Sequence, residues 1–155
     1  MALKRFFFPG SFDPFTKGHE AIVIKALELV DELVIGIGVH SSKTPYFTLE
    51  SRQNHIIELF KNKPVEVVSY KGLTVDACVL NSCSHLLRGL RDSKDFQYER
   101  SIAHMNYDLH SIETIFLLTD LPLSAINSTI VREIHQNGGH IHGFVTNADL
   151  LITQV

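Results

Sequence analysis

The stretch RFFFPGSFDPFTKGH, residues 5–19, decides the fold class of this chain. It begins with an apolar run typical of a buried strand and continues through a segment rich in turn-forming Pro and Gly. It ends where an amphipathic pattern begins. We therefore predict a strand at residues 4–8, a turn-rich loop at residues 9–18 and a helix at residues 19–30.

The same alternation of strand and helix continues along the chain. Further strands are predicted at residues 33–39, 65–70, 85–87 and 114–118, and further helices at residues 48–60, 74–82, 92–109, 128–136 and 147–153. Such alternation predicts an α/β fold with a single doubly wound, five-stranded parallel sheet and helices on both faces, in one domain over residues 1–155. In such a sheet, ligands bind beyond the C-terminal ends of the strands, at the point where the strand order reverses.

Composition and charge narrow the class of protein. The 155 residues carry a formal net charge of -3, whereas a general nucleic-acid binder usually has a basic surplus, so we expect no nucleic-acid partner. No apolar stretch approaches the ~18 residues of a membrane span. Cys78 and Cys83 lack metal-ligand spacing, and a reduced environment suits them. We expect a soluble cytoplasmic protein.

The usual signatures of metal and nucleotide sites are absent from the sequence. It has nine histidines but neither an HExxH motif nor a Cys/His cluster, so we expect no metal held by the protein alone. It also lacks a GxSxG elbow, a GxGxxG fingerprint and a P-loop. These absences disfavour serine hydrolases, ordinary dinucleotide enzymes and kinases.

The loop after the first predicted strand suits a phosphate group. Gly10 allows close approach to the backbone, and Ser11 can donate a hydroxyl hydrogen bond. Gly18 and His19 open the next helix, whose free N–H groups and dipole favour anions. On spacing alone, a tight strand-to-helix turn with a capping histidine is an equally good interpretation.

Two arginines follow the fourth predicted strand, in the run Arg88-Gly89-Leu90-Arg91. Their guanidinium groups can both face one pocket and bind phosphate oxygens in pairs. Glu99, on the next predicted helix, can accept a hydrogen bond from a ribose hydroxyl. Solvated side chains explain each of these residues singly, but the expected position of this strand beside the first favours a pocket.

Two further loops are expected at the same edge of the sheet. Asn127, Ser128 and Thr129 crowd a helix start, where each can be an N-cap and all three together suggest a second anion site. A plain helix cap is about as good an interpretation. Lys43 lies in the loop after the second predicted strand, where a lone lysine is usually solvated surface.

These motifs together resemble the T/HxGH nucleotidyltransferases and, more specifically, the phosphopantetheine adenylyltransferase family. The resemblance covers most of the chain in order, and it is carried by PGSFDP at 9–14, TKGH at 16–19, KTP at 43–45, FTLE at 47–50, RGLR at 88–91, DFQYE at 95–99, AHMN at 103–106 and NSTIVR at 127–132. It implies the Rossmann-like nucleotidyltransferase fold and a homohexamer. The implied reaction joins ATP and 4′-phosphopantetheine to give dephospho-coenzyme A and pyrophosphate, in coenzyme A biosynthesis.

The resemblance also implies roles for individual residues. The implied catalytic residues are His19, Lys43 and Arg91. The acceptor substrate contacts Ser11, Lys43, Thr74 and Arg88. The implied ATP site consists of Ser11, Phe12, His19, Gly89, Leu90, Arg91, Glu99, Leu123, Ser124, Ala125, Ile126, Asn127, Ser128 and Thr129.

The expected chemistry needs no general base, because a phosphate monoester with a second pKa of about 6 is largely dianionic near neutral pH. The difficulty is to bring two polyanions together, so cations must oppose their repulsion and hold the attacking oxygen in line. We expect Mg²⁺ as a cofactor on the ATP phosphates, with few protein ligands. Transfer should be direct, without a covalent intermediate.

The sequence departs from the family pattern at two positions and leaves two other functions open. Asn127 replaces a usual serine, Leu123 stands where several relatives carry tryptophan, and the chain after Gly138 has no assigned role. One alternative is another transferase, such as a nicotinamide-mononucleotide adenylyltransferase or a glycerol-phosphate cytidylyltransferase, against which the RGLR run argues. The other is a non-catalytic nucleotide-binding regulator, against which the retention of Ser11 and His19 argues.

Overall fold

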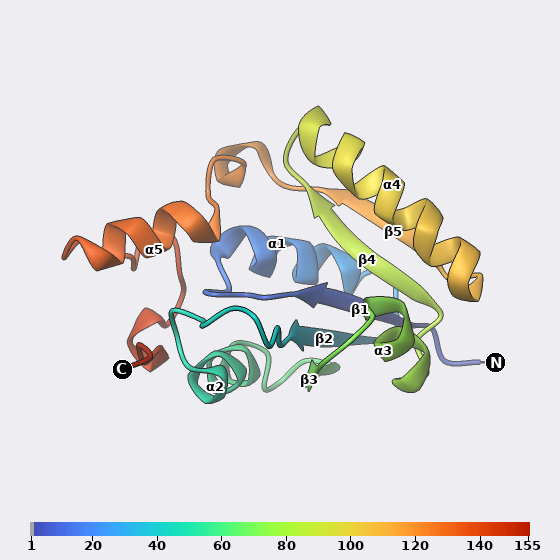
Figure 1. Ribbon diagram of the computed structural model, residues 1–155, viewed down its shortest axis with the longest axis horizontal. Coiled ribbons are helices and arrows are strands. Elements are labelled where there is room, and N and C mark those ends of the chain that lie inside the picture. Colours follow the sequence, from blue (N-terminus) through green and yellow to red (C-terminus); the bar gives the residue numbers. More distant parts are fainter. Residues whose placement is uncertain (1) are drawn as a thin grey trace.

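A five-stranded, all-parallel sheet forms the centre of the computed structural model, which describes residues 2–155 (Figure 1). Its strands are β1 (Arg5–Gly10), β2 (Glu32–Gly38), β3 (Val65–Tyr70), β4 (His85–Leu90) and β5 (Glu113–Leu118). They lie in the order β3-β2-β1-β4-β5, so the winding direction reverses between β1 and β4. The predicted doubly wound α/β fold is confirmed.

Helices cover both faces of this sheet. They are α1 (Lys17–Ala26), α2 (Leu49–Leu59), α3 (Thr74–Leu80), α4 (Ser93–His110) and α5 (Ser128–Gln136), with short 3₁₀ turns η1 (Leu121–Leu123) and η2 (Ala148–Leu150). Residues of α1 and α2 share one core cluster with the sheet, and residues of α3 share a second cluster. No helix in the part of the chain that the structure describes is long and apolar enough to cross a membrane.

The three phenylalanines of β1 explain why the first strand is apolar throughout. Phe6 and Phe8 belong to the cluster under α1 and α2, whereas Phe7 packs with Val34 and the residues of α3. A central strand with both faces covered needs apolar residues at every position. Gly36 of β2 makes room for Phe7, since a Cβ there would lie 2.2 Å from the ring carbon Cζ.

Three predicted boundaries are wrong. Helix α1 begins at Lys17 because extended Thr16 is its N-cap, and it ends at Ala26 rather than at residue 30. Strand β4 continues through Leu90, so Arg88 lies within a strand rather than in a loop. The helix predicted at 147–153 is only the turn η2.

The segment after Gly138 joins the other elements instead of forming a helix. Thr153 pairs with Phe47 in an isolated antiparallel bridge, and the N–H of Lys17 donates to the carbonyl of Phe144 at 2.8 Å. A third core cluster holds this segment in place; its buried members are Phe47, Val131, Ile141, Val145 and Ala148. Figure 1 shows the C-terminus beside α2, far from the N-terminus. The segment therefore ties together the starts of α1 and α2.

Candidate active site

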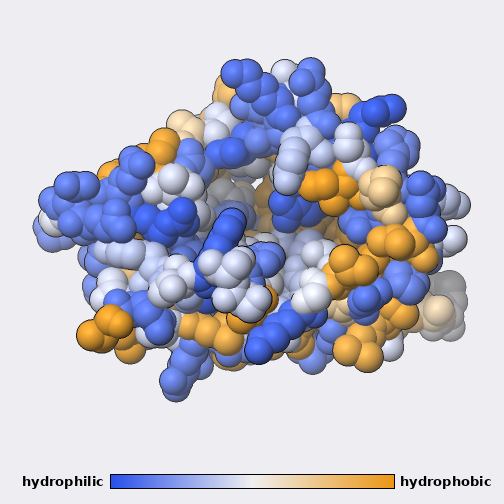
Figure 2. Space-filling model, viewed as in Figure 1, coloured by the Kyte–Doolittle hydropathy of each residue, from blue (hydrophilic) through white to orange (hydrophobic). Residues whose placement is uncertain are grey.

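A cavity of about 280 Å³, here called the switch-point cavity, opens where the strand order reverses between β1 and β4. Figure 2 shows a hollow near the middle of the face, surrounded mostly by hydrophilic side chains. The lining residues are Phe8, Pro9, Gly10, Ser11, Phe12, Thr16, Gly18, His19, Ile22, Arg88, Gly89, Arg91, Asp95, Glu99, Thr119, Ile126, Asn127 and Ser128. This is the expected ligand position in a doubly wound sheet.

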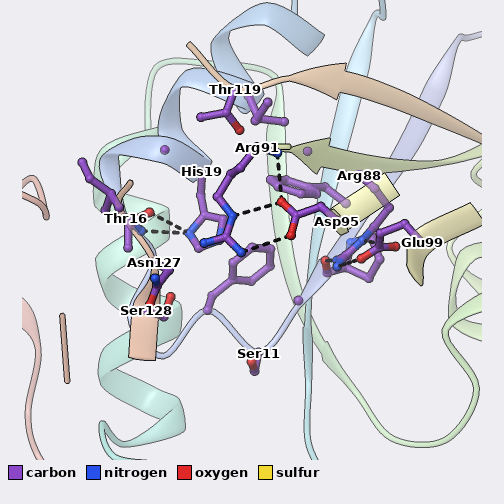
Figure 3. A pocket seen from close by; sticks show the side chains of 18 residues that line it. Ser11, Thr16, His19, Arg88, Arg91, Asp95, Glu99, Thr119, Asn127 and Ser128 are labelled. Carbon is purple, nitrogen blue, oxygen red and sulfur yellow. Dashed lines mark hydrogen bonds and ion pairs between the residues drawn. The ribbon is translucent and has the colours of Figure 1, made fainter. Parts of the chain in front are cut away.

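His19 lies in this cavity as a neutral hydrogen-bond donor. The backbone N–H of Thr16 donates to its Nδ1 at 2.9 Å, so Nδ1 carries no proton and Nε2 carries the ring hydrogen (Figure 3). The ring packs edge-on against Phe12, with 5.1 Å between ring centroids. Burial, together with the charges of Arg88 and Arg91, lowers the pKa of His19 to about 3.

Each arginine of the RGLR run is held by a carboxylate from α4 (Figure 3). Arg88 Nε and Nη2 donate to Glu99 at 3.1 and 2.6 Å, and its Nη1 donates to the Pro9 carbonyl at 2.6 Å. Arg91 Nε donates to Asp95 at 3.1 Å, and this hydrogen bond raises the pKa of Arg91. Both guanidinium groups are thereby oriented on the cavity wall, and the contact that the structure gives to Glu99 is with Arg88.

The start of α5 uses its polar side chains to build the wall. Asn127 Oδ1 accepts from the N–H of Ile130 at 2.9 Å and is the N-cap, and Ser128 Oγ donates to the Pro14 carbonyl at 2.8 Å. Thr129 Oγ1 accepts from Arg132 at 3.3 Å. The side chains of the predicted three-residue anion site are thus engaged within the protein. Within the described residues, the backbone N–H groups of Ser128 and Thr129 have no hydrogen-bond partner and can receive an anion.

Some residues predicted for the ATP site stand outside the cavity lining. One of them, Leu90, is buried. The other predicted residues outside the lining are Leu123, Ser124, Ala125 and Thr129. The turn that contains Leu123 flanks the start of α1, since a Cβ on Gly18 would lie 3.9 Å from the Leu123 carbonyl oxygen. These residues border the cavity rather than facing it.

Two further cavities adjoin the first. The Thr74 cavity, of about 390 Å³, shares five wall residues with the switch-point cavity: Pro9, Gly10, Ser11, Arg88 and Glu99. The Lys43 cavity, of about 440 Å³, contains Lys43, Arg52 and Arg132. Predicted partners Lys43 and Arg88 thus line different cavities, because Arg88 is held by Glu99 while Lys43 lies on an exposed loop. Ser11 lines all three cavities.

Sequence reasoning missed several residues of these walls. Thr16 and Asp95 carried a usable signal, since residues three or four apart on a helix lie side by side and so can pair with His19 and Arg91. Arg132 lies in the NSTIVR motif, although no role was predicted for it. Thr119 and Arg52 carried no signal, because their places depend on how distant segments pack.

The family of the chain follows from comparison with known proteins. The cytidylyltransferase-like family matches residues 7–134, a span that includes every strand end around the switch-point cavity, and the chain belongs to this class of nucleotidyltransferases. A phosphopantetheine adenylyltransferase of Flavobacterium psychrophilum is 47% identical over 94% of this chain and 97% of the relative. One of Bacteroides thetaiotaomicron is 42% identical over 92% and 95%. The chain is a member of the phosphopantetheine adenylyltransferase family, as the sequence motifs predicted.

Solved structures share the fold at much lower identity. A bifunctional NMN adenylyltransferase/ADP ribose pyrophosphatase from Francisella tularensis gives a TM-score of 0.72 at 18% identity, covering 97% of this chain and 47% of that one. A putative nicotinate-nucleotide adenylyltransferase from Vibrio parahaemolyticus gives 0.67 at 14% identity, covering 96% and 97%. These likenesses concern the fold alone.

Proposed function

We propose that the protein transfers the adenylyl group of ATP to 4′-phosphopantetheine, giving dephospho-coenzyme A and pyrophosphate. Family membership supports the activity. The observation that carries it is the common wall of two cavities, formed by the Pro9–Ser11 backbone, Arg88 and Glu99. Two anionic reactants can occupy adjoining cavities there and meet with their phosphates at the common wall.

Each cavity suits one reactant. The switch-point cavity presents His19 and Arg91 to a nucleoside triphosphate. The wall of the Thr74 cavity is partly apolar, and this part suits an extended pantetheine arm; its members include Leu73, Leu86, Ile102 and Ala103. We assign Arg88 and Ser11, which face both cavities, to the acceptor phosphate. Lys43 reaches the same phosphate from the neighbouring cavity, which meets the other two at Ser11.

The reaction is a direct displacement at phosphorus. An oxygen of the acceptor phosphate attacks the α-phosphorus of ATP, the new P–O bond forms, and the bond to the β-phosphate oxygen breaks to release pyrophosphate. The acceptor is already ionised, so no protein group has to remove a proton. Charge on the α-phosphate oxygens is stabilised by the Nε2–H of His19 and by Arg91, which are fixed in place before ATP binds.

Magnesium enters this scheme with the nucleotide. Within residues 2–155, no three or more His, Cys, Asp or Glu side chains gather to hold a metal ion. The cavity carboxylates, Asp95 and Glu99, are each bound to an arginine. We therefore assign Mg²⁺ to the ATP phosphates, where it keeps most of its waters and neutralises charge. EDTA should stop pyrophosphate release without lowering the unfolding temperature of the protein.

A homohexamer in the cytoplasm is the remaining part of the proposal. None of the 18 residues of helix α4 is fully buried against the rest of the described chain. It leaves Tyr98, Met105 and Leu109 exposed at 71%, 63% and 55%. Contiguous exposed apolar residues are typical of a surface that another chain covers. Light scattering during size-exclusion chromatography should give six times the chain mass, and a monomer would contradict this part.

A substrate panel tests the activity itself. Purified protein is assayed for pyrophosphate release with ATP or CTP, each combined with 4′-phosphopantetheine, nicotinamide mononucleotide or glycerol 3-phosphate. Release is expected only with ATP and 4′-phosphopantetheine. Pantetheine without its phosphate is the matched control and should be inactive. Preference for another acceptor would indicate a different transferase, and nucleotide binding without release from any acceptor would indicate a regulator.

A further inference from the structure

Arg52 is a buried cation without an anionic partner. It lies in the second turn of α2, and its residue is only 4% exposed. Its Nη1 donates to the Ser11 carbonyl at 2.6 Å, and its Nε donates to the Phe47 carbonyl at 3.1 Å. No carboxylate lies within 4.0 Å of its guanidinium group among residues 2–155.

This arrangement is costly for a purely structural residue. A buried ion loses much of its hydration free energy, and arginine is almost never fully buried unless it is paired. Burial lowers the pKa of Arg52 accordingly. The nearby carboxylate, Asp13, uses its two oxygens for the N–H groups of Tyr46 and Phe47, at 2.7 and 2.9 Å. Two carbonyl groups are therefore the only hydrogen-bond partners of the Arg52 guanidinium group in the described chain.

The carbonyl that Arg52 holds belongs to the residue at the meeting point of the three cavities. In a trans peptide the C=O and the following N–H point in opposite directions. Because the Ser11 carbonyl points to Arg52, the N–H of Phe12 points away from it. That N–H donates to no other group in residues 2–155, and Phe12 lines the switch-point cavity.

The backbone at Phe12 needs such support. Its φ of 46° lies in the left-handed region, which is unfavourable for a residue other than glycine. Such a conformation persists only where the surroundings impose it. The Phe12 ring is held against His19 on one side, and Arg52 fixes the preceding peptide on the other.

We propose that Arg52 is a positioning residue for adenylyl transfer, which holds the Ser11–Phe12 peptide so that the Phe12 N–H and the Ser11 hydroxyl meet the reacting phosphates. This inference rests on the proposed function for its kinetic test. Arg52 touches neither reacting phosphate in this role and acts through Ser11 and Phe12.

Removal and chemical replacement of the guanidinium group test the inference. Arg52→Ala leaves a space that adjoins the Lys43 cavity, which Arg52 lines, so added guanidinium ion can enter. We expect kcat to fall by about 10- to 100-fold, as for other misplacements of about 1 Å, with a smaller change in the KM for ATP. Guanidinium should restore part of the loss, Arg52→Lys should be intermediate, and Arg100→Ala, on the exposed face of α4, should behave as wild type.

Binding supplies a readout independent of turnover. In wild-type protein, ATP should shift the Phe12 amide resonance in an NMR titration, and in Arg52→Ala this shift should be lost and then regained with guanidinium. A folded Arg52→Ala variant with wild-type kcat and a wild-type Phe12 shift would overturn the inference. A loss of kcat that is fully explained by the fraction of unfolded protein, and that added guanidinium does not restore, would overturn the inference as well. If wild-type protein releases no pyrophosphate, the proposed function fails, and the Phe12 titration alone decides the role of Arg52.

Discussion

The backbone N–H of Thr16 donates to Nδ1 of His19, with 2.9 Å between the two nitrogens. An amide N–H is always a donor, so this bond fixes the tautomer of the ring and leaves Nε2–H for a ligand. His19 therefore completes the capping box of helix α1 with the N-cap Thr16, and the same side chain is the donor of the cavity. The two interpretations of His19 that the sequence leaves open, a capping residue and a phosphate donor, are compatible.

Replacement of His19 by alanine should lower kcat far more than it weakens ATP binding. Loss of one transition-state hydrogen bond costs about 2.7–4 kcal/mol, or 10²–10³ in rate. Steady-state kinetics and ATP titration calorimetry measure the two quantities. His140→Ala, at an exposed position, is the control. An unchanged kcat in His19→Ala would remove this residue from the chemistry.

His19 should remain neutral throughout the physiological range. Its pKa is about 3 in the folded protein, whereas an unperturbed histidine has a pKa near 6.5. Below pH 6.5, His19 of the unfolded chain therefore binds a proton that His19 of the folded chain does not bind. The free energy of unfolding should fall as the pH drops from about 6.5 toward 3. In His19→Gln the fall should be shallower, with a remainder from buried His55, whose pKa is also lowered by burial.

An NMR titration of the His19 ring nitrogens measures the protonation state of this residue directly. Between pH 8 and pH 5, the His19 resonances should keep the values of the Nε2–H tautomer. A titration midpoint near 6.5 would show that the ring is solvated and not held by Thr16.

Gly18→Ala should separate activity from stability. A Cβ at this position would meet no atom closer than 3.5 Å, and its neighbours Thr16 and Thr119 both line the cavity. Since alanine is favoured over glycine in helices, the free energy of unfolding should stay equal or rise by up to about 1 kcal/mol. The methyl group occupies space that a phosphate needs, so kcat/KM for ATP should fall about 10- to 100-fold. Gly143→Ala, where a Cβ meets nothing within 4 Å, should leave both quantities unchanged.

Arg88→Lys should affect the acceptor more than the nucleotide. Lysine keeps the charge but loses the paired contacts to Glu99 and the Pro9 carbonyl. We expect the KM for 4′-phosphopantetheine to rise about tenfold, which corresponds to about 1.4 kcal/mol. The KM for ATP should change less, and Arg100→Lys should change neither. Equal effects on both substrates would contradict the place of Arg88 at the common wall.

The sequence predicted the sheet and its edge because local patterns decide them. The continuous apolar run in β1 and the alternation of strands and helices do not depend on distant contacts. Helix ends were harder to predict from the sequence. The end of α1 at Ala26, for example, has no glycine or proline signal. The false helix at 147–153 failed for a tertiary reason, because this segment pairs with Phe47 and with the start of α2.

The residues that line the site likewise fall into those that local sequence predicts and those that only tertiary packing reveals. Ser11, His19 and Arg91 follow strands whose ends must meet at one edge, and Arg88 lies near the end of β4; the structure brings all four to one cavity. Arg52 reads as an ordinary helix residue in sequence. Only the packing of α2 beneath the first loop shows that it reaches the Ser11 carbonyl.

The stereochemistry at phosphorus tests most directly whether two phosphates meet at the common wall. The substrate is ATP with a chiral α-phosphorothioate, and the configuration of the dephospho-coenzyme A product is determined by ³¹P NMR. A single in-line attack by the acceptor phosphate predicts inversion. Retention would mean two displacements through a covalent enzyme intermediate and would contradict direct transfer between the adjoining cavities.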